Sequence, residues 1–168
     1  PKNDKIVIGR HSRDHEVKWP VTKEELLRVY PNYSPYEVRV LGGAKAPIKL
    51  LNGIPSNWKV FEFGEMEPKQ FLKDLDVFVY YTHPDLKEAF GRVIFEAMAV
   101  GVPVILPPVF KPVFEEAAIY AETNEVLQTI NWLIDHKKAY ERQVNIAFEY
   151  VEKHFGYSQH EERLRSAF

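Results

Sequence analysis

Short hydrophobic runs that suit strands alternate with stretches of helical periodicity, and this alternation constrains the fold more than any other feature. The strand-like runs occupy residues 5–9, 36–43, 58–64, 76–81, 103–106 and 119–121. Helices are expected to begin near residue 22, at Pro68 and at residue 91, and further helices are expected at 126–134, 140–151 and 158–168. Such alternation predicts a Rossmann-like, three-layer α/β fold, with a parallel sheet covered on both faces.

The length of the chain suits one domain. Its 168 residues are 45% hydrophobic, which is enough for a sizeable core. We expect residues 1–168 to form a single domain. The sequence opens without an initiator Met and enters a strand almost at once, so we expect a fragment of a longer protein.

Composition and charge exclude several classes of function. The net charge of −2 gives no basic surplus for nucleic-acid binding, and the absence of cysteine excludes disulfides, thiol catalysis and cysteine metal sites. No run of about 18 apolar residues is present, so we expect no membrane span. The six histidines show no metal-ligand spacing, and we expect no metal.

Ligands of parallel α/β sheets bind beyond the carboxyl ends of the strands. The loop after the first strand, expected at 9–18, is basic there and carries Arg10, Arg13 and Lys18. These cations suit a phosphate-bearing ligand. The alternative is a solvated loop in which neighbouring acids neutralise the cations.

Two glutamates border the helix that begins near residue 91. Glu96 has apolar neighbours in sequence and needs a partner, which is either Arg92 one turn earlier or a ligand diol such as a ribose. Glu88 stands at the helix entrance, beside Gly91. The two acids are separated by roughly 8–12 Å along a helix axis, which suits two parts of one extended ligand better than the paired acids of a glycoside hydrolase.

The segment EAFGRVIFEAMAVGVPVI (88–105) resembles the signature of retaining GT-B glycosyltransferases, specifically the large family 4 group (glycosyl transferases group 1). The resemblance extends to KIVIGR (5–10), WKVFEFGEM (58–66) and DVFVYYTHPDLKEAFG (76–91). It implies that the chain is the C-terminal, donor-binding half of a GT-B fold, and that the N-terminal acceptor domain is absent.

The resemblance also implies roles for individual residues. Glu88 would contact hydroxyls of the transferred sugar, and Glu96 the ribose of the nucleotide. The diphosphate would be held by Arg10 and Lys18, with Arg13 as the alternative to Lys18. Backbone N–H groups at the helix start would contact the diphosphate, and these belong to the segment Ala89, Phe90, Gly91 and Arg92. Phe63 and Met66 would border the nucleobase.

The implied reaction is a retaining, metal-independent transfer from a nucleotide-diphosphate sugar to an unknown acceptor, without a cofactor. We therefore expect a transferase of cell-envelope or polysaccharide biosynthesis, located in the cytoplasm, with peripheral membrane attachment of the full-length protein left open. The isolated fragment should bind nucleotide weakly and transfer nothing. Three alternatives remain: a nucleotide-sugar epimerase of GT-B type, a non-catalytic nucleotide- or sugar-binding module, and a structural domain in which Arg92 neutralises Glu96.

Overall fold

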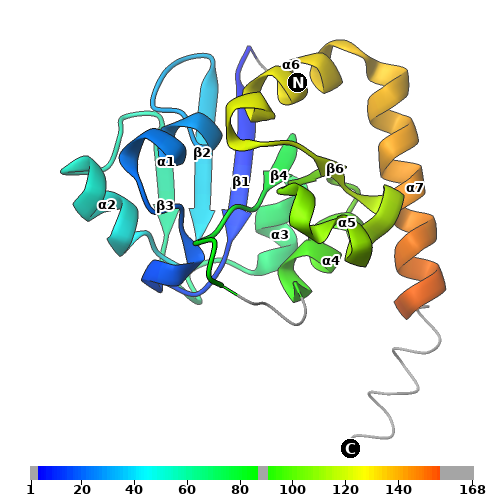
Figure 1. Ribbon diagram of the computed structural model, residues 1–168, viewed down its shortest axis with the longest axis horizontal. Coiled ribbons are helices and arrows are strands. Elements are labelled where there is room, and N and C mark those ends of the chain that lie inside the picture. The colour runs from blue at the N-terminus through cyan, green and yellow to red at the C-terminus, as the bar shows by residue number, and fades with distance from the viewer. Residues whose placement is uncertain (1–3, 87–90, 156–168) are drawn as a thin grey trace, which may run out of the picture.

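A parallel sheet forms the centre of the molecule (Figure 1). The computed structural model describes residues 4–86 and 91–155. In this part of the chain six strands form one sheet with the order β3-β2-β1-β4-β5-β6, and every neighbouring pair is parallel. The strands are β1 (Ile6–His11), β2 (Tyr36–Leu41), β3 (Trp58–Phe61), β4 (Val77–Val79), β5 (Val104–Leu106) and β6 (Ile119–Tyr120). This is a doubly wound order, in which the winding reverses between β1 and β4.

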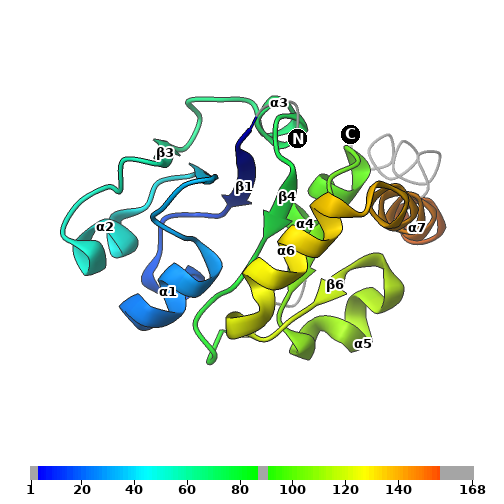
Figure 2. The ribbon, with the colours of Figure 1, turned by 90° about the horizontal axis from the view of Figure 1, so that it is seen from above.

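Helices cover both faces of the sheet. They are α1 (Lys23–Val29), α2 (Lys45–Leu51), α3 (Pro68–Lys73), α4 (Arg92–Ala99), α5 (Lys111–Phe114), α6 (Val126–Asp135) and α7 (Lys137–Phe155). Short 3-10 turns are η1 (Glu16–Lys18), η2 (Pro108–Phe110), η3 (Glu115–Ala117) and η4 (Thr123–Glu125). Apolar side chains of α1, α2 and α6 pack on one face, and those of α3, α4, α5 and α7 on the other. Figure 2 shows α1 and α2 on one side of the sheet and α3 and α7 on the other.

The strands feed these two cores through their alternation. In β4 the buried Val77 and Val79 belong to the core under α1 and α6, whereas Phe78 belongs to the core under α3 and α4. Successive side chains of a strand point to opposite faces, so both faces of a central strand must be apolar. This is the physical reason why the strands read as near-continuous hydrophobic runs.

The fold class predicted from the sequence is confirmed, and so is each predicted strand, with shifted ends. The hydroxyl of Thr22 accepts a hydrogen bond from the backbone N–H of Glu25 at 3.1 Å, which caps α1 as the sequence indicates. Two predictions need correction. The first strand continues to His11, because β1 pairs with β2 as far as Leu41, and α2 was not foreseen. The helix expected at 158–168 lies outside the described residues.

Two glycines let the loop after β1 approach β2. Gly42 has φ +110°, and a Cβ there would come within 1.9 Å of the carbonyl oxygen of Ser12. Gly43 has φ +90°, and a Cβ there would meet a carboxylate oxygen of Asp14 at 2.7 Å. Asp14 also accepts a hydrogen bond from the backbone N–H of Lys45 at 3.1 Å, so the loop is fixed to the start of α2.

Over residues 4–86 and 91–155, none of the helices combines the length and the apolar character needed to cross a bilayer.

Candidate functional site

β1 and β4 are neighbours at the centre of the sheet, where Ile8 and Gly9 pair with Val77 and Phe78. Because the two strands are parallel, their carboxyl ends lie at the same edge of the sheet. A crevice at such a switch point is the usual ligand site of open α/β sheets. The loop that contains η1 and the segment after β4 border this position, at the lower edge of the molecule in Figure 1. A hydrogen bond of 3.0 Å from the backbone N–H of His83 to the carbonyl oxygen of Val17 joins the two segments.

Arg10 was expected in the loop after the first strand. It lies instead within β1, where its side chain is 0% exposed. Its guanidinium donates to the Tyr30 hydroxyl (3.4 Å), the Tyr81 carbonyl (3.1 Å), the Ser12 hydroxyl (2.8 Å) and the Lys18 carbonyl (2.5 Å). All four acceptors are neutral oxygens. Burial of a cation without an acid costs free energy, and an anion bound nearby would offset that cost.

An aromatic ring covers this buried charge. The guanidinium carbon of Arg10 lies 3.7 Å from the centroid of a Trp19 ring. Trp19 is 2% exposed, contacts Tyr30 edge-to-face at 5.8 Å and stacks on Trp58 at 6.5 Å. Stacking on an aromatic face suits a guanidinium, because the quadrupole of the ring attracts the positive charge and the ring itself keeps water away. Arg10 is therefore a built-in part of the core beneath η1.

Two further cations lie beside Arg10, on the loop above it. Arg13 is exposed, and Lys18 ends η1 with a half-buried side chain. Burial lowers the pKa of Lys18, and the positive charges of Arg10 and Arg13 lower it further. The structure thus brings together the three cations that the sequence singled out. Together the three charges produce a positive potential, and a bound anion would offset their mutual repulsion.

Glu96 faces the opposite side of β1. The buried residues of α4 are Ile94, Ala97 and Met98, whereas the Glu96 side chain is 36% exposed. The sequence neighbours of Glu96 suggested an apolar environment, and that expectation was wrong. Glu96 lies on the side of α4 that faces away from the core, because successive residues of a helix point in different directions. Its negative charge acts on His11, the last residue of β1, so α4 directs this carboxylate towards the carboxyl edge of the sheet.

The two partners considered for Glu96 can now be compared. The Nε atom of Arg92 lies 3.2 Å from a Glu96 carboxylate oxygen, and the Arg92 side chain is 89% exposed. An exposed i, i+4 pair contributes roughly 0.3–0.5 kcal/mol, so it does not prevent Glu96 from accepting hydrogen bonds from a ligand.

The helix entrance is described only in part. Gly91 is the N-cap of α4, and no side chain caps the helix there. A Cβ on Gly91 would lie 2.5 Å from Cδ1 of Ile94, so a larger residue here would require the Ile94 side chain to shift. Glu88, Ala89 and Phe90 lie outside the described residues.

Phe63 and Met66 follow β3 at the same edge of the sheet. Phe63 is 76% exposed, which is unusual for a phenylalanine, whereas Met66 packs against the core under α3 and α4. An exposed aromatic face is available for stacking on a planar ring.

His11 is not among the site residues expected from the sequence, although the structure places it within reach of the Glu96 charge. Its Nδ1 is buried and has no hydrogen-bond partner among the described residues. Burial lowers the pKa of His11, the charge of Glu96 opposes that shift, and the charge of Arg10 adds to it. A polar residue at the end of a central strand was the available signal. Within the described ranges, no three His, Asp or Glu side chains form a group suited to a metal ion.

The fold and its edge define a doubly wound α/β domain of the kind found as the C-terminal half of GT-B proteins. The profile of the family described as "Glycosyl transferases group 1" matches residues 3–136, and the chain belongs to this family. A search of curated proteins gave no significant match.

Solved structures of the same fold agree. HepE of Anabaena, solved with UDP-glucose, is 21% identical with a TM-score of 0.71; the match covers 96% of this chain and 49% of HepE. The C-terminal domain of LpcC, a group 1 family protein of Francisella tularensis, is 20% identical with a TM-score of 0.66, covering 90% of this chain and 87% of that domain. The catalytic domain of the Helicobacter pylori cholesterol-α-glucosyltransferase is 17% identical, with a TM-score of 0.64 and coverage of 88% and 98%. The chain spans about half the length of HepE.

Proposed function

We propose that this chain binds the nucleotide-diphosphate sugar donor of a retaining glycosyltransferase, as the C-terminal domain of the enzyme. The observation that carries the proposal is the flanking of the β1/β4 switch point by opposite charges. Arg10, Arg13 and Lys18 lie on one side of β1, and the Glu96 carboxylate lies on the other. A nucleoside diphosphate has the matching chemistry, with an anionic diphosphate and a neutral ribose diol.

Each part of the donor has a proposed partner. Arg13 and Lys18 would contact the diphosphate directly, because Arg13 is exposed and Lys18 is only half-buried. Arg10 is enclosed by Trp19 and its four acceptors, and so would hold the loop and add positive potential. Glu96 would accept hydrogen bonds from the ribose diol. Phe63 would border the base.

The same charges suit the transfer step. In that step the bond from the anomeric carbon to the diphosphate oxygen breaks, and negative charge grows on the leaving diphosphate. Cations and helix-start N–H groups placed in advance stabilise that charge, and one such donor contributes about 3–4 kcal/mol to lowering a barrier. A same-face reaction, in which the leaving oxygen takes the acceptor proton, would retain the configuration. Glu88 would hold hydroxyls of the sugar during this step.

The donor class that we favour is a UDP-sugar, because HepE was solved with UDP-glucose on the same fold. The acceptor would be held by an N-terminal domain that pairs with this one, and the enzyme would act in cell-envelope or polysaccharide biosynthesis. No metal or organic cofactor is part of the proposal.

A binding panel tests the proposal. Titration of the chain with UDP, GDP and ADP and with their glucose conjugates, followed by calorimetry, should give one nucleotide that binds in preference to the others. Arg13→Ala should weaken that binding about tenfold, the value expected for one charge-assisted hydrogen bond. Arg28→Ala is the matched control, because Arg28 is a partly exposed arginine in the last turn of α1, at the other edge of the sheet. Absence of binding by all six compounds would refute the proposal.

A further inference from the structure

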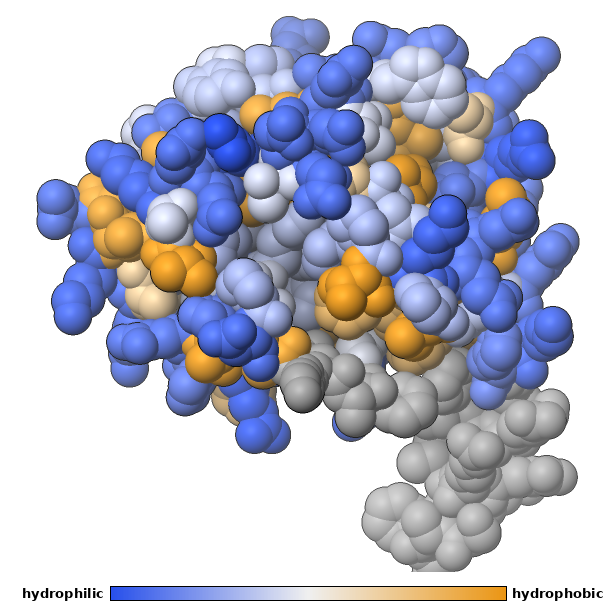
Figure 3. Space-filling model, viewed as in Figure 1, coloured by the Kyte–Doolittle hydropathy of each residue, from blue (hydrophilic) through white to orange (hydrophobic). Residues whose placement is uncertain are grey.

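Polar groups distinguish the carboxyl edge of the sheet more clearly than apolar surface does. Figure 3 shows one face of the molecule, which is mostly hydrophilic and carries its apolar residues in small, separate patches. Scattered apolar residues of this kind are normal on a protein surface. His11 is different, because this last residue of β1 has one ring nitrogen, Nδ1, enclosed without a hydrogen-bond partner among the described residues.

Strand pairing fixes the direction of the His11 side chain. His11 is in register with Leu41 of the parallel strand β2, and Leu41 belongs to the core under α3 and α4. Side chains that are in register on neighbouring strands point to the same face of a sheet. Val7, four residues before His11 on β1, also packs against that core, as the alternation of a strand requires. His11 therefore points to the face that α4 covers.

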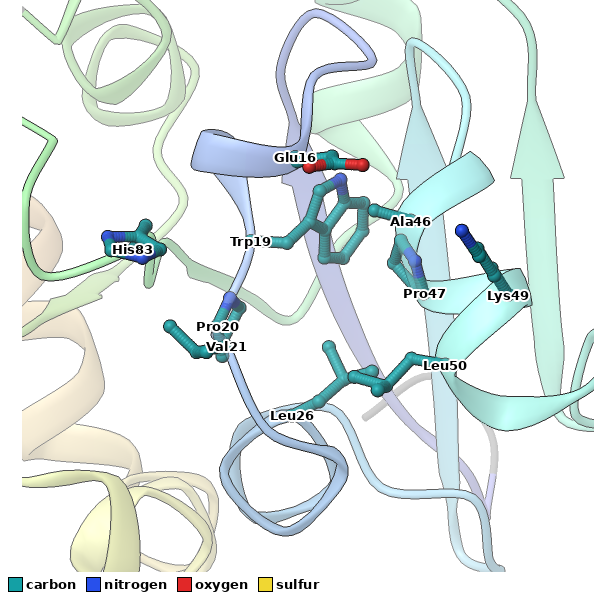
Figure 4. A pocket seen from close by; sticks show the side chains of 10 residues that line it. All are labelled: Glu16, Trp19, Pro20, Val21, Leu26, Ala46, Pro47, Lys49, Leu50 and His83. Carbon is teal, nitrogen blue, oxygen red and sulfur yellow. The ribbon is translucent and has the colours of Figure 1, made fainter.

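His83 lies on the opposite face of the same edge. It lines the groove beside α1 and α2, together with Trp19 and Leu26 (Figure 4). Its Nδ1 accepts a hydrogen bond from the backbone N–H of Asp85 at 3.0 Å, so this nitrogen has a partner within its own loop. His11 thus differs from His83 in the face that it occupies and in its unpaired ring nitrogen.

Glu96 lies on the same side of the sheet as His11 and near the same edge. α4 begins at the carboxyl edge (Figure 1), and Glu96 comes four residues after Arg92, the first residue of the helix, or about 6 Å along its axis. Burial lowers the pKa of His11, and the neighbouring charge that acts on it most strongly is that of Glu96, which opposes the shift. His11 is partly exposed and the Glu96 side chain is 36% exposed, so a ligand can reach both residues.

The surroundings of the His11 ring decide where its proton lies. A neutral imidazole has one proton for two nitrogens. The enclosed nitrogen is Nδ1 and not Nε2, and the residue as a whole is partly exposed. A proton on Nδ1 would be a buried donor without an acceptor, which costs free energy, so the neutral ring carries its proton on Nε2. His11 thus offers an N–H donor on the face of the sheet that carries the Glu96 carboxylate.

We infer that His11 is a second ribose ligand beside Glu96, and that its Nε2–H donates to a ribose hydroxyl whose own proton is donated to the Glu96 carboxylate. One hydroxyl can make both hydrogen bonds, because it has one donor and two acceptor lone pairs. The inference rests on the proposed function and adds a specificity to it. A site that hydrogen-bonds a substrate hydroxyl rejects the analogue that lacks it, since the polar groups of the site are then left unpaired.

The position of the proton is measurable without any ligand. Long-range ¹H–¹⁵N spectra of the chain at pH 8 distinguish a protonated ring nitrogen from a bare one, and the His11→Gln variant identifies the His11 signals. Nε2 should be protonated and Nδ1 bare. A proton on Nδ1 in the free chain would overturn the inference, whatever the chain binds.

A cycle of variants and nucleotides tests the shared hydroxyl by calorimetry. His11→Phe keeps a planar ring, removes the N–H and should weaken UDP binding about threefold to tenfold, as the loss of one hydrogen bond predicts. Either 2′-deoxy-UDP or 3′-deoxy-UDP should bind the parent less tightly than UDP, and His11→Phe should bind that analogue as tightly as the parent does. If the His11→Phe loss is the same for UDP and for both analogues, His11 does not contact the ribose and the inference is wrong.

Further variants control for the change of side chain. His11→Gln places an N–H near the position of Nε2 and should recover most of the UDP affinity. His154→Phe is the matched control, because His154 is exposed near the end of α7, and it should bind UDP as the parent does. If circular dichroism shows that His11→Phe does not fold, His11→Asn takes its place, since its shorter amide does not extend to the position of Nε2.

The outcomes separate this inference from the proposed function. If the parent binds none of the nucleotides in the panel, the proposed function is refuted and His11 has no ribose to hold. If UDP binds the parent and His11→Phe with equal affinity, the proposed function stands and the role of His11 is refuted.

Discussion

The guanidinium of Arg10 lies 3.7 Å from a Trp19 ring centroid, and its Nη2 donates to the Lys18 carbonyl oxygen. The buried cation thus connects the central strand to the loop that carries the other two cations. Its four oxygen acceptors are all neutral, so within residues 4–86 and 91–155 the charge is stabilised by hydrogen bonds and by stacking on Trp19. This arrangement gives Arg10 a structural role that is measurable independently of any ligand.

Arg10→Ala should lower the free energy of unfolding by about 1–3 kcal/mol, because buried acceptors of the guanidinium lose their donor. Chemical denaturation followed by circular dichroism measures this change. Arg28→Ala should change stability by no more than about 0.5 kcal/mol, since Arg28 pairs with Glu24 in solvent. Similar values for the two variants would contradict the structural role of Arg10.

Tyr30→Phe should also destabilise the chain by about 1–3 kcal/mol, the cost of an unsatisfied buried group. The Tyr30 hydroxyl donates to the Val79 carbonyl oxygen at 2.7 Å and accepts from Arg10, inside a 0% exposed environment. Thermal or urea unfolding gives the comparison with Tyr33→Phe, whose ring is 53% exposed and which should be nearly neutral. A neutral Tyr30→Phe variant would show that the hydroxyl is dispensable.

The lowered pKa of His11 should make the free energy of unfolding depend on pH. Burial lowers its pKa in the folded chain, so the unfolded chain binds a proton first, from about pH 6.5 downward. The stability contributed by neutral His11 is therefore present above pH 6.5 and is lost as the pH falls from there to the folded pKa. His11→Asn should show a smaller loss between pH 7 and pH 5 in denaturation midpoints. The charges of Glu96 and Arg10 also act on the pKa of His11. If the parent and His11→Asn lose stability in parallel as the pH falls, His11 does not contribute to the pH dependence.

We expect Lys18 to take up a proton when a diphosphate binds at alkaline pH. Burial and the charges of Arg10 and Arg13 lower its pKa in the free chain, and a bound anion should raise it again. Affinity for UDP should therefore decline as the pH rises through the lowered pKa, which lies below the usual 10.5. Calorimetry at pH 9 in buffers of different ionisation enthalpy counts the protons. Lys18→Gln should remove the uptake, and an unchanged uptake would assign it elsewhere.

Glu96→Gln should weaken UDP binding about tenfold, because a carboxylate accepts two diol hydrogen bonds more strongly than an amide. The same variant should bind 2′,3′-dideoxy-UDP as the parent does. Glu149→Gln, on the exposed side of α7, is the control for the change of charge. Equal losses for both nucleotides would place Glu96 away from the ribose.

The succession of strands along the chain, and the edge of the sheet at which the candidate residues were expected, follow from the sequence alone. Alternating hydrophobic runs specify strands that need two apolar faces, and Thr22 starts α1 through a local hydrogen bond. These signals depend on residues that are close in sequence, so they can be recognised without knowledge of the tertiary contacts. The boundary of β1 was misjudged, since its extension to His11 depends on pairing with β2, which is remote in sequence.

The tertiary structure decided which face of β1 each site residue occupies. Arg10 packs under Trp19, and His11, one residue later, points to the face of α4 and Glu96. The sequence contains all four residues, but the packing of η1 on one face and α4 on the other determines their neighbours. Side chains of a strand alternate strictly, so a single position separates a cation enclosed in the core from an imidazole at the carboxyl edge.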